Sequence, residues 1–237
     1  MPILRVHAKQ GHVDTETTDA LVLLLCEGEG LPKEDGAILD RALGGALRDL
    51  LQSKEFDGKA GEVVLFHTHG KIPAKRVILV GLGKKHDLGL DQIRQAMGHA
   101  VKRVRQAKAG TFAVALPSSV PHGASPIDVG QTMTEGAILG SYQFTTYRSD
   151  APTGKGVTAM TVLAPQKDQL RQLSEGIRRG VATAEATVYV RDLCNHPSNV
   201  MTPTRIASEA KTVAKEVGVN LKIVEQTEME QLGMGAP

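Results

Sequence analysis

The run Ala20–Cys26 (ALVLLLC) constrains the fold of this chain more than any other segment. Side chains of a strand point alternately to its two faces, so an unbroken apolar run has no face suited to water. Such runs are typical of a central strand that is covered on both faces, as in parallel sheets flanked by helices. The chain is therefore expected to be an α/β protein.

The rest of the chain supports this fold class, because short apolar runs alternate with apolar residues spaced as in helices. Strands are expected at 3–8, 63–66, 76–80, 111–116 and 158–163. Helices are expected at 38–50, 90–104, 127–147 and 170–191, where apolar residues recur every three or four positions. Within the third of these, Gly136 and Gly140 would permit close packing against a neighbour. The pattern predicts a mainly parallel or mixed sheet with helices around it.

The composition changes at 149–156 (SDAPTGKG), which is typical of a surface connection. Residues 1–155 are therefore predicted to form the first domain, a mixed sheet flanked by helices. Residues 156–237 are predicted to hold a linker helix and the first strand and helix of a second α/β domain.

A shorter helix is expected early in this second part. Thr202 is suited to cap it, Pro203 to begin it and Gly218 to end it. Its buried face would consist of residues 206, 210, 213 and 217, and a strand is expected at 221–224.

Composition disfavours some classes of protein, although a sequence pI near 8.5 leaves nucleic-acid binding possible. Lysine and arginine number 28 against 26 acidic residues, and aromatic residues are 3% with no tryptophan, so neither charge nor stacking favours nucleic-acid binding. The basic clusters at 102–108 and 178–179 have the spacing of solvated helix faces. No segment resembles a signal peptide or approaches membrane-spanning length, so a cytoplasmic protein is expected.

Cysteine and histidine give little support for a metal site. The two cysteines, Cys26 and Cys194, are too few for a disulfide framework or a cysteine-rich metal site, and both are predicted to be buried thiols. His67 and His69 would lie on one face of an extended segment, but no third ligand is near, so a polar strand end is the favoured interpretation.

Three glycine-containing segments are candidates for phosphate-binding loops. Gly81-Leu82-Gly83 follows a strand, but His86 takes the place of the third glycine of a dinucleotide loop. The segment ending at Gly154-Lys155 lacks the first glycine and the hydroxyl residue of a P-loop.

The third segment, residues 28–36, is rich in glycine and precedes a helix. It could present N–H groups to an anion, as the comparable turn of macro domains does for ADP-ribose. Four carboxylates in or beside this loop, at 27, 29, 34 and 35, would repel a diphosphate. We therefore interpret it as an ordinary connection.

One longer motif is far more specific. Residues 191–203 (RDLCNHPSNVMTP) closely resemble the junction that opens the catalytic domain of leucyl aminopeptidases. Three further segments resemble that family in the same order, namely 76–84 (RVILVGLGK), 135–148 and 228–236 (EMEQLGMGA). The resemblance covers most of the chain and is weakest over its first seventy or so positions.

The resemblance implies a macro-like first domain followed by a catalytic domain with two divalent metal ions, Mn or Zn. It also implies removal of N-terminal residues from peptides, and assembly as a homo-oligomer, a hexamer in the family. The family's metal ligands lie around Gly-Lys-Gly…Phe-Asp-Ser-Gly-Gly and Asn-Thr-Asp-Ala-Glu-Gly-Arg stretches, which this sequence lacks. No residue here is therefore assigned a catalytic, metal-binding or cofactor-binding role.

The chain is thus expected to be the N-terminal, non-catalytic portion of such an enzyme. Pro237 stands where the family continues with a large apolar residue, which suggests a truncation, a frameshift or a fragment. The alternative is a self-standing macro-like module that binds ADP-ribose or nucleic acid. Residues 190–237 favour the first hypothesis, because a free module has no use for the beginning of a second domain.

Overall fold

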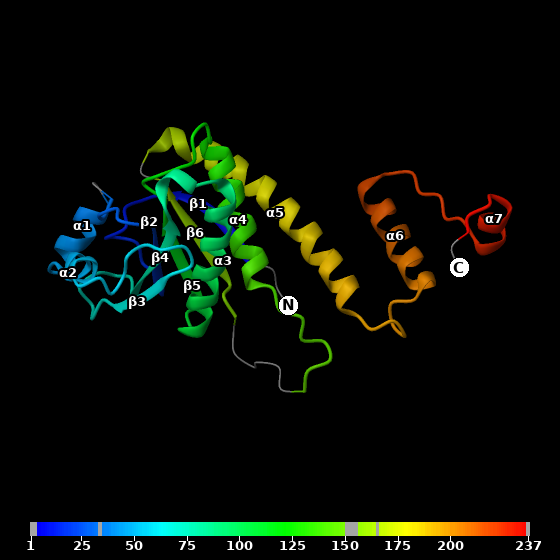
Figure 1. The fold of residues 1–237 in the computed structure, drawn as a ribbon, viewed down its shortest axis with the longest axis horizontal. Coiled ribbons are helices and arrows are strands. Elements are labelled where there is room, and N and C mark those ends of the chain that lie inside the picture. Colours follow the sequence, from blue (N-terminus) through cyan, green and yellow to red (C-terminus); the bar gives the residue numbers. More distant parts are fainter. Residues whose placement is uncertain (1–3, 33–34, 150–155, 165, 236–237) are drawn as a thin grey trace. The chain divides into compact units, whose positions relative to one another are not determined.

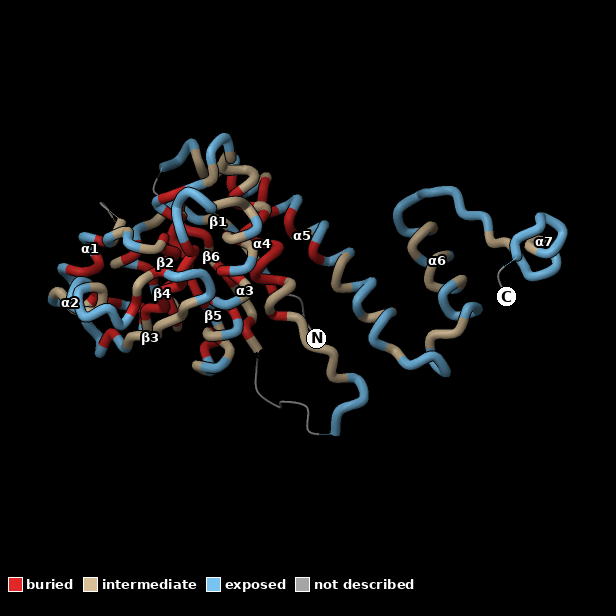
Figure 2. Tube along the Cα trace, viewed as in Figure 1, coloured by how far each residue is buried: buried red, intermediate tan, exposed pale blue. Residues whose placement is uncertain are grey.

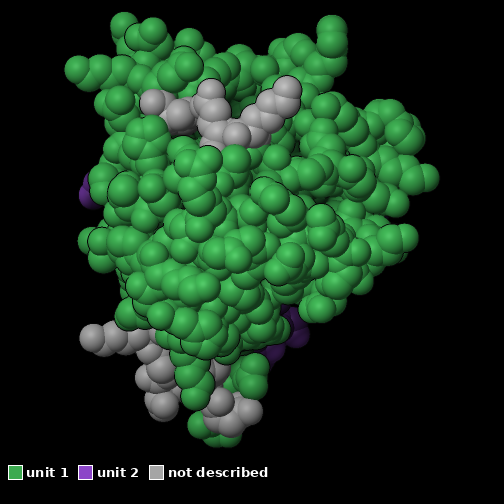
Figure 3. Space-filling view, turned by 90° about the vertical axis from the view of Figure 1, so that its left-hand side faces the viewer, with its two compact units in different colours: residues 1–188 green, residues 189–237 purple. Residues whose placement is uncertain are grey.

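The computed structural model describes residues 4–32, 35–149, 156–164 and 166–235. The chain divides into two compact units, Met1–Val188 and Tyr189–Pro237 (Figure 3). The predicted boundary at 155 comes earlier in the sequence, before a strand that belongs to the sheet of the first unit. The described part contains no helix that is both long and apolar enough to span a membrane.

The first unit contains one mixed sheet of strands in the order β1-β6-β5-β2-β4-β3 (Figure 1). Its strands are β1 (Arg5–Gln10), β2 (Ala20–Cys26), β3 (Val63–His67), β4 (Arg76–Gly83), β5 (Thr111–Ala115) and β6 (Ala159–Ala164). All neighbouring pairs are parallel except β3 with β4, which is antiparallel. The predicted mixed sheet is confirmed, although its first strand begins at Arg5 rather than at residue 3.

Helices cover both faces of this sheet. They are α1 (Asp35–Ala42), α2 (Ala46–Gln52), α3 (Leu90–Gln106), α4 (Pro126–Ser141) and α5 (Lys167–Asn195), with a short 3-10 turn at Lys85–Asp87. Residues of α3, α4 and α5 share one buried apolar cluster with the sheet. Leu39 of α1 and Leu47 of α2 belong to the other cluster, on the opposite face. Buried residues are concentrated in the strands and in the helices that pack on them (Figure 2).

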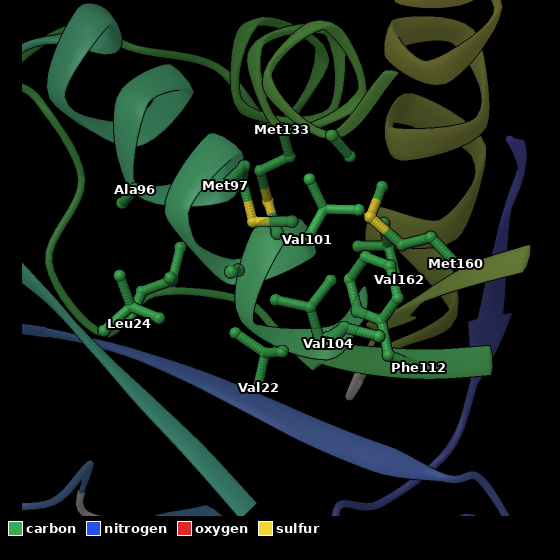
Figure 4. Packing of buried hydrophobic residues seen from close by; sticks show 14 of the residues in the cluster. Val22, Leu24, Ala96, Met97, Val101, Val104, Phe112, Met133, Met160 and Val162 are labelled. Atoms are coloured by element: carbon green, nitrogen blue, oxygen red, sulfur yellow. The ribbon is translucent and has the colours of Figure 1, made fainter. Parts of the chain in front are cut away.

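Strand β2 lies inside the sheet, between β5 and β4, and its residues are all buried. Val22 and Leu24 belong to the cluster under α3 and α4, whereas Leu21 and Leu23 belong to the cluster under α1 and α2. Figure 4 shows the first of these clusters, with Val22 close to side chains from α3. The prediction that Ala20–Cys26 is a strand covered on both faces is confirmed.

Helices α3 and α4 pack closely because glycine lies at their contact. A Cβ placed on Gly136 would lie 2.2 Å from the carbonyl oxygen of Arg94, and one on Gly140 would lie 2.7 Å from the Cα of Gly98. Beside the contact, Arg94 Nη2 pairs with Glu135 Oε2 at 2.9 Å. The predicted close approach at Gly136 and Gly140 is confirmed.

Two predicted helices are interrupted or end early in the structure, whereas α5 (Lys167–Asn195) extends beyond the predicted 170–191 at both ends. The expected helix at 38–50 is two helices, because Gly44 (φ 74°) and Gly45 (φ 87°) take left-handed conformations between them. The helix expected to reach residue 147 ends at Ser141, where Tyr142 turns to an extended conformation (φ −57°, ψ 134°). In both cases the apolar spacing continues beyond the residue where the helix ends. The helix ends there because the backbone leaves the helical conformation.

The second unit contains the end of α5, then α6 (Pro203–Val217) and α7 (Gln226–Gln231). The predicted limits of α6 are confirmed: Thr202 Oγ1 accepts a hydrogen bond from the N–H of Arg205 at 3.3 Å, and Gly218 ends the helix with φ 73°. Pro203 occupies the first turn, where a missing N–H costs nothing.

No described residue of the second unit is buried. The predicted buried face of α6 is therefore wrong for this chain, since Ile206 is 51% and Val217 62% exposed. The strand predicted at 221–224 is also absent from the structure. The described part of this unit supplies neither a second layer to cover the helix nor a strand to pair with that segment.

Candidate functional site

The carboxyl ends of β2, β4 and β5 lie side by side at one edge of the sheet, because these strands are parallel neighbours. From β2 the chain continues to β3 and β4 on one side, whereas from β5 it continues to β6 on the other. Neighbouring strands whose connections diverge in this way form a topological switch point, where α/β proteins commonly bind ligands. The loops that follow β2 and β5 are thus well placed to form a ligand site.

Glu29 joins the loops at this edge. Its Oε1 accepts a hydrogen bond from Ser119 Oγ at 2.8 Å and one from Lys85 Nζ at 2.8 Å. Ser119 follows β5 and Lys85 follows β4, so one carboxylate connects segments after three adjacent strands. In the sequence, Glu29 is predicted only as a charge that repels anions. Its two partners could not be predicted, since no local pattern relates positions 29, 85 and 119.

The lowered pKa of the Glu29 carboxyl is consistent with a structural role for this residue. Burial alone would raise the pKa of the Glu29 carboxyl, but the hydrogen bonds from Lys85 and Ser119 outweigh it, so the pKa lies below its ordinary value. Burial, and then the neighbouring Glu29 carboxylate, raises the pKa of the Cys26 thiol. Cys26 is therefore a neutral thiol at neutral pH, not an activated nucleophile.

The two cysteines differ in exposure. Cys26 is buried, as predicted, whereas Cys194 is exposed, so the prediction for Cys194 is wrong. Cys194 lies near the end of α5, in the unit that has no buried residue among those described, and apolar neighbours in sequence do not bury it there.

The glycine-rich loop after β2 borders a pocket of about 460 Å³. Its lining includes three carboxylates, of Glu29, Asp40 and Asp57, and one cation, Arg48. Arg48 Nη2 already pairs with Asp40 Oδ2 at 3.3 Å. The other two carboxylates also have cation partners, since Glu29 pairs with Lys85 and Asp57 pairs with Lys59. These cations are therefore already paired, which disfavours a diphosphate such as that of ADP-ribose.

The histidine pair does not form a metal site. The rings of His67 and His69 have centroids 6.2 Å apart, and His69 has a left-handed backbone (φ 51°). Across the described ranges, no group of three or more His, Cys, Asp or Glu side chains could hold a metal ion. The donor set that the chain offers here thus does not fit a resident metal centre.

The Gly81-Leu82-Gly83 motif is not a ligand loop in this structure. Gly81 and Gly83 belong to β4 rather than to a loop after it. A Cβ on Gly81 would lie 2.0 Å from the carbonyl oxygen of Lys59, so close packing of a neighbouring segment explains this glycine. Gly154 and Lys155 lie outside the described residues.

The 191–203 motif forms the connection between α5 and α6. The carbonyl oxygen of Pro197 accepts hydrogen bonds from the N–H groups of Val200 and Met201, each at 2.9 Å, which closes a tight turn. Tyr189, just before the motif, donates a hydrogen bond through its hydroxyl to Glu209 Oε2 of α6 at 2.8 Å. That bond lowers the pKa of the Glu209 carboxyl.

The fold and the edge loops define a three-layer α/β domain joined by a long helix to the first helices of a second unit. Two family descriptions match the chain in that order: the N-terminal domain of the cytosol aminopeptidase family over residues 22–151, and its catalytic domain over 188–237. The chain belongs to the cytosol aminopeptidase family, and the resemblance noted in the sequence is confirmed.

Individual relatives agree with this assignment. A probable cytosol aminopeptidase of Alkaliphilus oremlandii is 33% identical over 98% of this chain and 47% of its own length. One from a Geobacter species is 41% identical over 83% of this chain and 39% of its own length. The chain thus spans less than half the length of these relatives.

Solved structures show the same fold. A tomato leucine aminopeptidase mutant superposes with a TM-score of 0.82 at 23% identity, over 98% of this chain and 46% of that one. The bottromycin maturation enzyme BotP in complex with Mn gives a TM-score of 0.67 at 23% identity, over 92% of this chain and 40% of that one.

Proposed function

We propose that this chain serves as the N-terminal, non-catalytic portion of an aminopeptidase, and that the longer protein removes N-terminal residues from peptides. The observation that supports the proposal is the agreement between two boundaries. The catalytic-domain match begins at residue 188, and the second compact unit begins at Tyr189. That unit has the start of a catalytic domain in sequence but no buried residue among those described.

The exposed apolar residues of the second unit indicate that a further layer of structure covers them in the longer protein. Ile206, Val217, Val219 and Leu221 are 44% to 62% exposed. Clustered apolar side chains of this kind are normally covered by another layer. We propose that the remainder of the catalytic domain covers them in the longer protein.

The metal centre belongs to the same proposal. We assign two divalent ions, Mn or Zn, to the longer protein, and BotP in complex with Mn supports the metal class. Because the described residues offer no ligand group, the metal ligands and catalytic residues are assigned to sequence outside this chain. We further propose a cytoplasmic hexamer acting on peptides; the relatives' name, cytosol aminopeptidase, supports the location.

The direct test is hydrolysis of leucyl p-nitroanilide by the purified chain with added Mn²⁺ or Zn²⁺. We expect no rate above that of the buffer with metal alone. Appreciable hydrolysis that copurifies with the chain would contradict the assignment of all catalytic residues elsewhere.

A complementation experiment tests the supporting role itself. The chain is mixed with a separate polypeptide that carries the remaining catalytic domain of the Geobacter relative, and activity is expected only when both are present. Ile206→Asp should abolish the restored activity, because it places a charge on the apolar side of α6. Ser208→Asp is the matched control, since it lies about 200° around the same helix and should leave the activity intact. Equal loss in both variants would contradict the proposed contact.

A further inference from the structure

Strand β1 lies at one edge of the sheet, where β6 is its neighbour on one side and no described strand lies on the other. Its ladder to β6 is parallel, and the N–H groups of Arg5 and Gly11 donate to carbonyl oxygens on the β6 side, at 3.1 and 3.3 Å. Alternate residues of such a strand direct their backbone groups to the same neighbour. The N–H and C=O groups of Val6 and Ala8 therefore point away from the sheet and form an unpaired edge.

A hollow of about 370 Å³, which we call the edge groove, lies between β1 and the part of α5 that belongs to the first unit. Val6 and Ala8 line it from the strand, and Ile177 and Val181 line it from the helix. Ile177 is buried, whereas the other three are half-buried and pack against the apolar cluster under α3 and α4. The edge groove thus offers apolar surface directly beside the unpaired backbone groups of β1.

An unpaired strand edge beside an apolar groove is the arrangement by which several protein families bind extended peptides. An added strand forms hydrogen bonds with the backbone groups of the edge, and every second side chain of that strand points into the groove. The remaining side chains of the peptide then lie on the other face of the sheet. On that face β1 presents Arg5, His7 and Lys9, which are exposed and alternate with the half-buried Val6 and Ala8.

The partners of these three side chains select among peptides. Lys9 Nζ already pairs with Glu16 Oε2 at 2.8 Å, and His7 Nε2 shares a hydrogen bond with Thr161 Oγ1 at 3.1 Å. Arg5, in contrast, has no ion-pair partner among the residues that the structure describes. A carboxylate in the added strand, on the same face, would supply the opposite charge, and such cross-strand pairs stabilise neighbouring strands.

The same side chains disfavour a second copy of β1 as the added strand. Paired with itself in either direction, β1 would place Arg5, His7 or Lys9 of one copy opposite a residue of the same set in the other. Like charges directly opposite each other on neighbouring strands are destabilising. The groove does not alter this preference, because its arginine, Arg178, already pairs with Glu175 at 2.9 Å. An acidic peptide is therefore favoured over self-association.

We propose that β1 and the edge groove bind an extended peptide in which acidic and branched apolar residues alternate. The peptide forms backbone hydrogen bonds with Val6 and Ala8, and one of its apolar side chains enters the groove and contacts Val181. An acidic side chain of the peptide pairs with Arg5. This surface is independent of peptide hydrolysis, so its failure would leave the proposed function unchanged.

The test is fluorescence polarisation of a labelled peptide, Thr-Glu-Val-Glu-Val-Glu-Thr with blocked termini, titrated with the full chain. We expect saturable binding. A peptide with lysine in place of each glutamate should bind at least about fivefold more weakly, because it places like charge against Arg5. N-methylation of either the valines or the glutamates should abolish binding, since one of these two sets of N–H groups bonds to β1.

Three variants locate the site. Ser174→Trp fills the edge groove from an exposed position on α5 and should abolish binding. Thr183→Trp is its matched control and should bind like the parent chain. Thr183 is also exposed, and the hydroxyls of both residues donate to the carbonyl oxygen four positions earlier, but Thr183 lies about 180° around the helix from Ser174. Arg5→Glu should weaken binding of the glutamate peptide about fivefold and strengthen binding of the lysine peptide by a similar factor.

Several results would overturn the proposal. It is wrong if polarisation does not saturate, if the lysine peptide binds the parent equally well, if neither set of methylated amides loses binding, or if Ser174→Trp binds like the parent. Sedimentation of the chain alone supplies one further check. A dimer that Ser174→Trp dissociates would mean that a second copy occupies the edge, which also contradicts the proposal.

Discussion

Two carboxylates hold the two ends of the central strand in the same way. Asp19, just before β2, accepts hydrogen bonds from Lys75 Nζ at 2.7 Å and from the N–H of Gly110 at 3.0 Å. Glu29, after β2, binds Lys85 and Ser119. Each carboxylate thus connects β2 with the neighbouring ends of β4 and β5. We infer that the pair sets the alignment of three parallel strands.

Asp19 should make stability depend on pH. The hydrogen bond from Lys75, helped by the N–H groups of Gly110 and Thr111 and opposed by burial, lowers the pKa of Asp19 below its ordinary 3.8. A lowered pKa gives stability that is present above the unfolded value and is lost as pH falls through the folded value. Asp19→Asn should therefore lower the free energy of unfolding by about 1–2 kcal/mol at pH 7. Urea denaturation should show this difference shrinking below about pH 4.

The control for this measurement is Asp87→Asn. The Asp87 side chain is 67% exposed, so its loss should change stability by less than about 0.5 kcal/mol at either pH. If the effect of Asp19→Asn were the same at pH 7 and at low pH, the carboxylate charge would not be its cause.

For single residues, the sequence predicted which side chains are buried better than it predicted their hydrogen-bond partners. The burial of Ala20–Cys26 followed from its unbroken apolar run, because only a strand covered on both faces suits it. The partners of Glu29 could not be predicted, since they lie 56 and 90 positions away and meet only after the strands pair. Cys194 was predicted wrongly because apolar neighbours bury a thiol only where a second layer covers them.

Among the elements, glycine decides where helices stop and how closely they pack. The apolar spacing of residues 38–50 predicts one helix, but Gly44 and Gly45 take left-handed conformations that interrupt it. The spacing could not reveal this, because it depends on side chains and not on backbone conformation. Gly136 and Gly140 acted as predicted, because small residues four apart lie on one face of a helix. Helix faces were thus easier to predict than helix ends.

The α3–α4 contact can be tested with two glycine-to-alanine changes. In Gly136→Ala the new Cβ would lie 2.2 Å from Arg94 O, so the helices must separate, at a cost of about 1–3 kcal/mol. In Gly98→Ala the new Cβ meets only Gly136 O at 3.8 Å, so the higher helix propensity of alanine should leave stability unchanged or raise it by up to about 1 kcal/mol. Urea denaturation midpoints measure both. Equal effects would mean that helix propensity, not the contact, governs this site.

Over the whole molecule, the two units differ in how many buried contacts stabilise them. Met1–Val188 contains both apolar clusters, whereas no described residue of Tyr189–Pro237 is buried. The strand expected at 221–224 shows why sequence alone was insufficient: its residues suit a sheet, but a strand needs a neighbour for its backbone groups. The family assignment did not depend on such pairing, because the 191–203 motif is specific in itself.

This difference predicts where protease will cut first. Trypsin should cleave after Lys211, Lys215 and Lys222, which are exposed in the second unit, before it cleaves after Lys102 in α3, whose helix packs on the sheet. Local opening costs little where few apolar contacts form. Mass spectrometry of timed digests should give the order of cleavage, and the cleaved protein should melt at the temperature of the intact chain.

Adding the remaining catalytic domain of the Geobacter relative should slow cleavage after Lys211 and Lys215, because it would cover α6. Protection of these sites in the chain alone would mean that the second unit is stable without that partner.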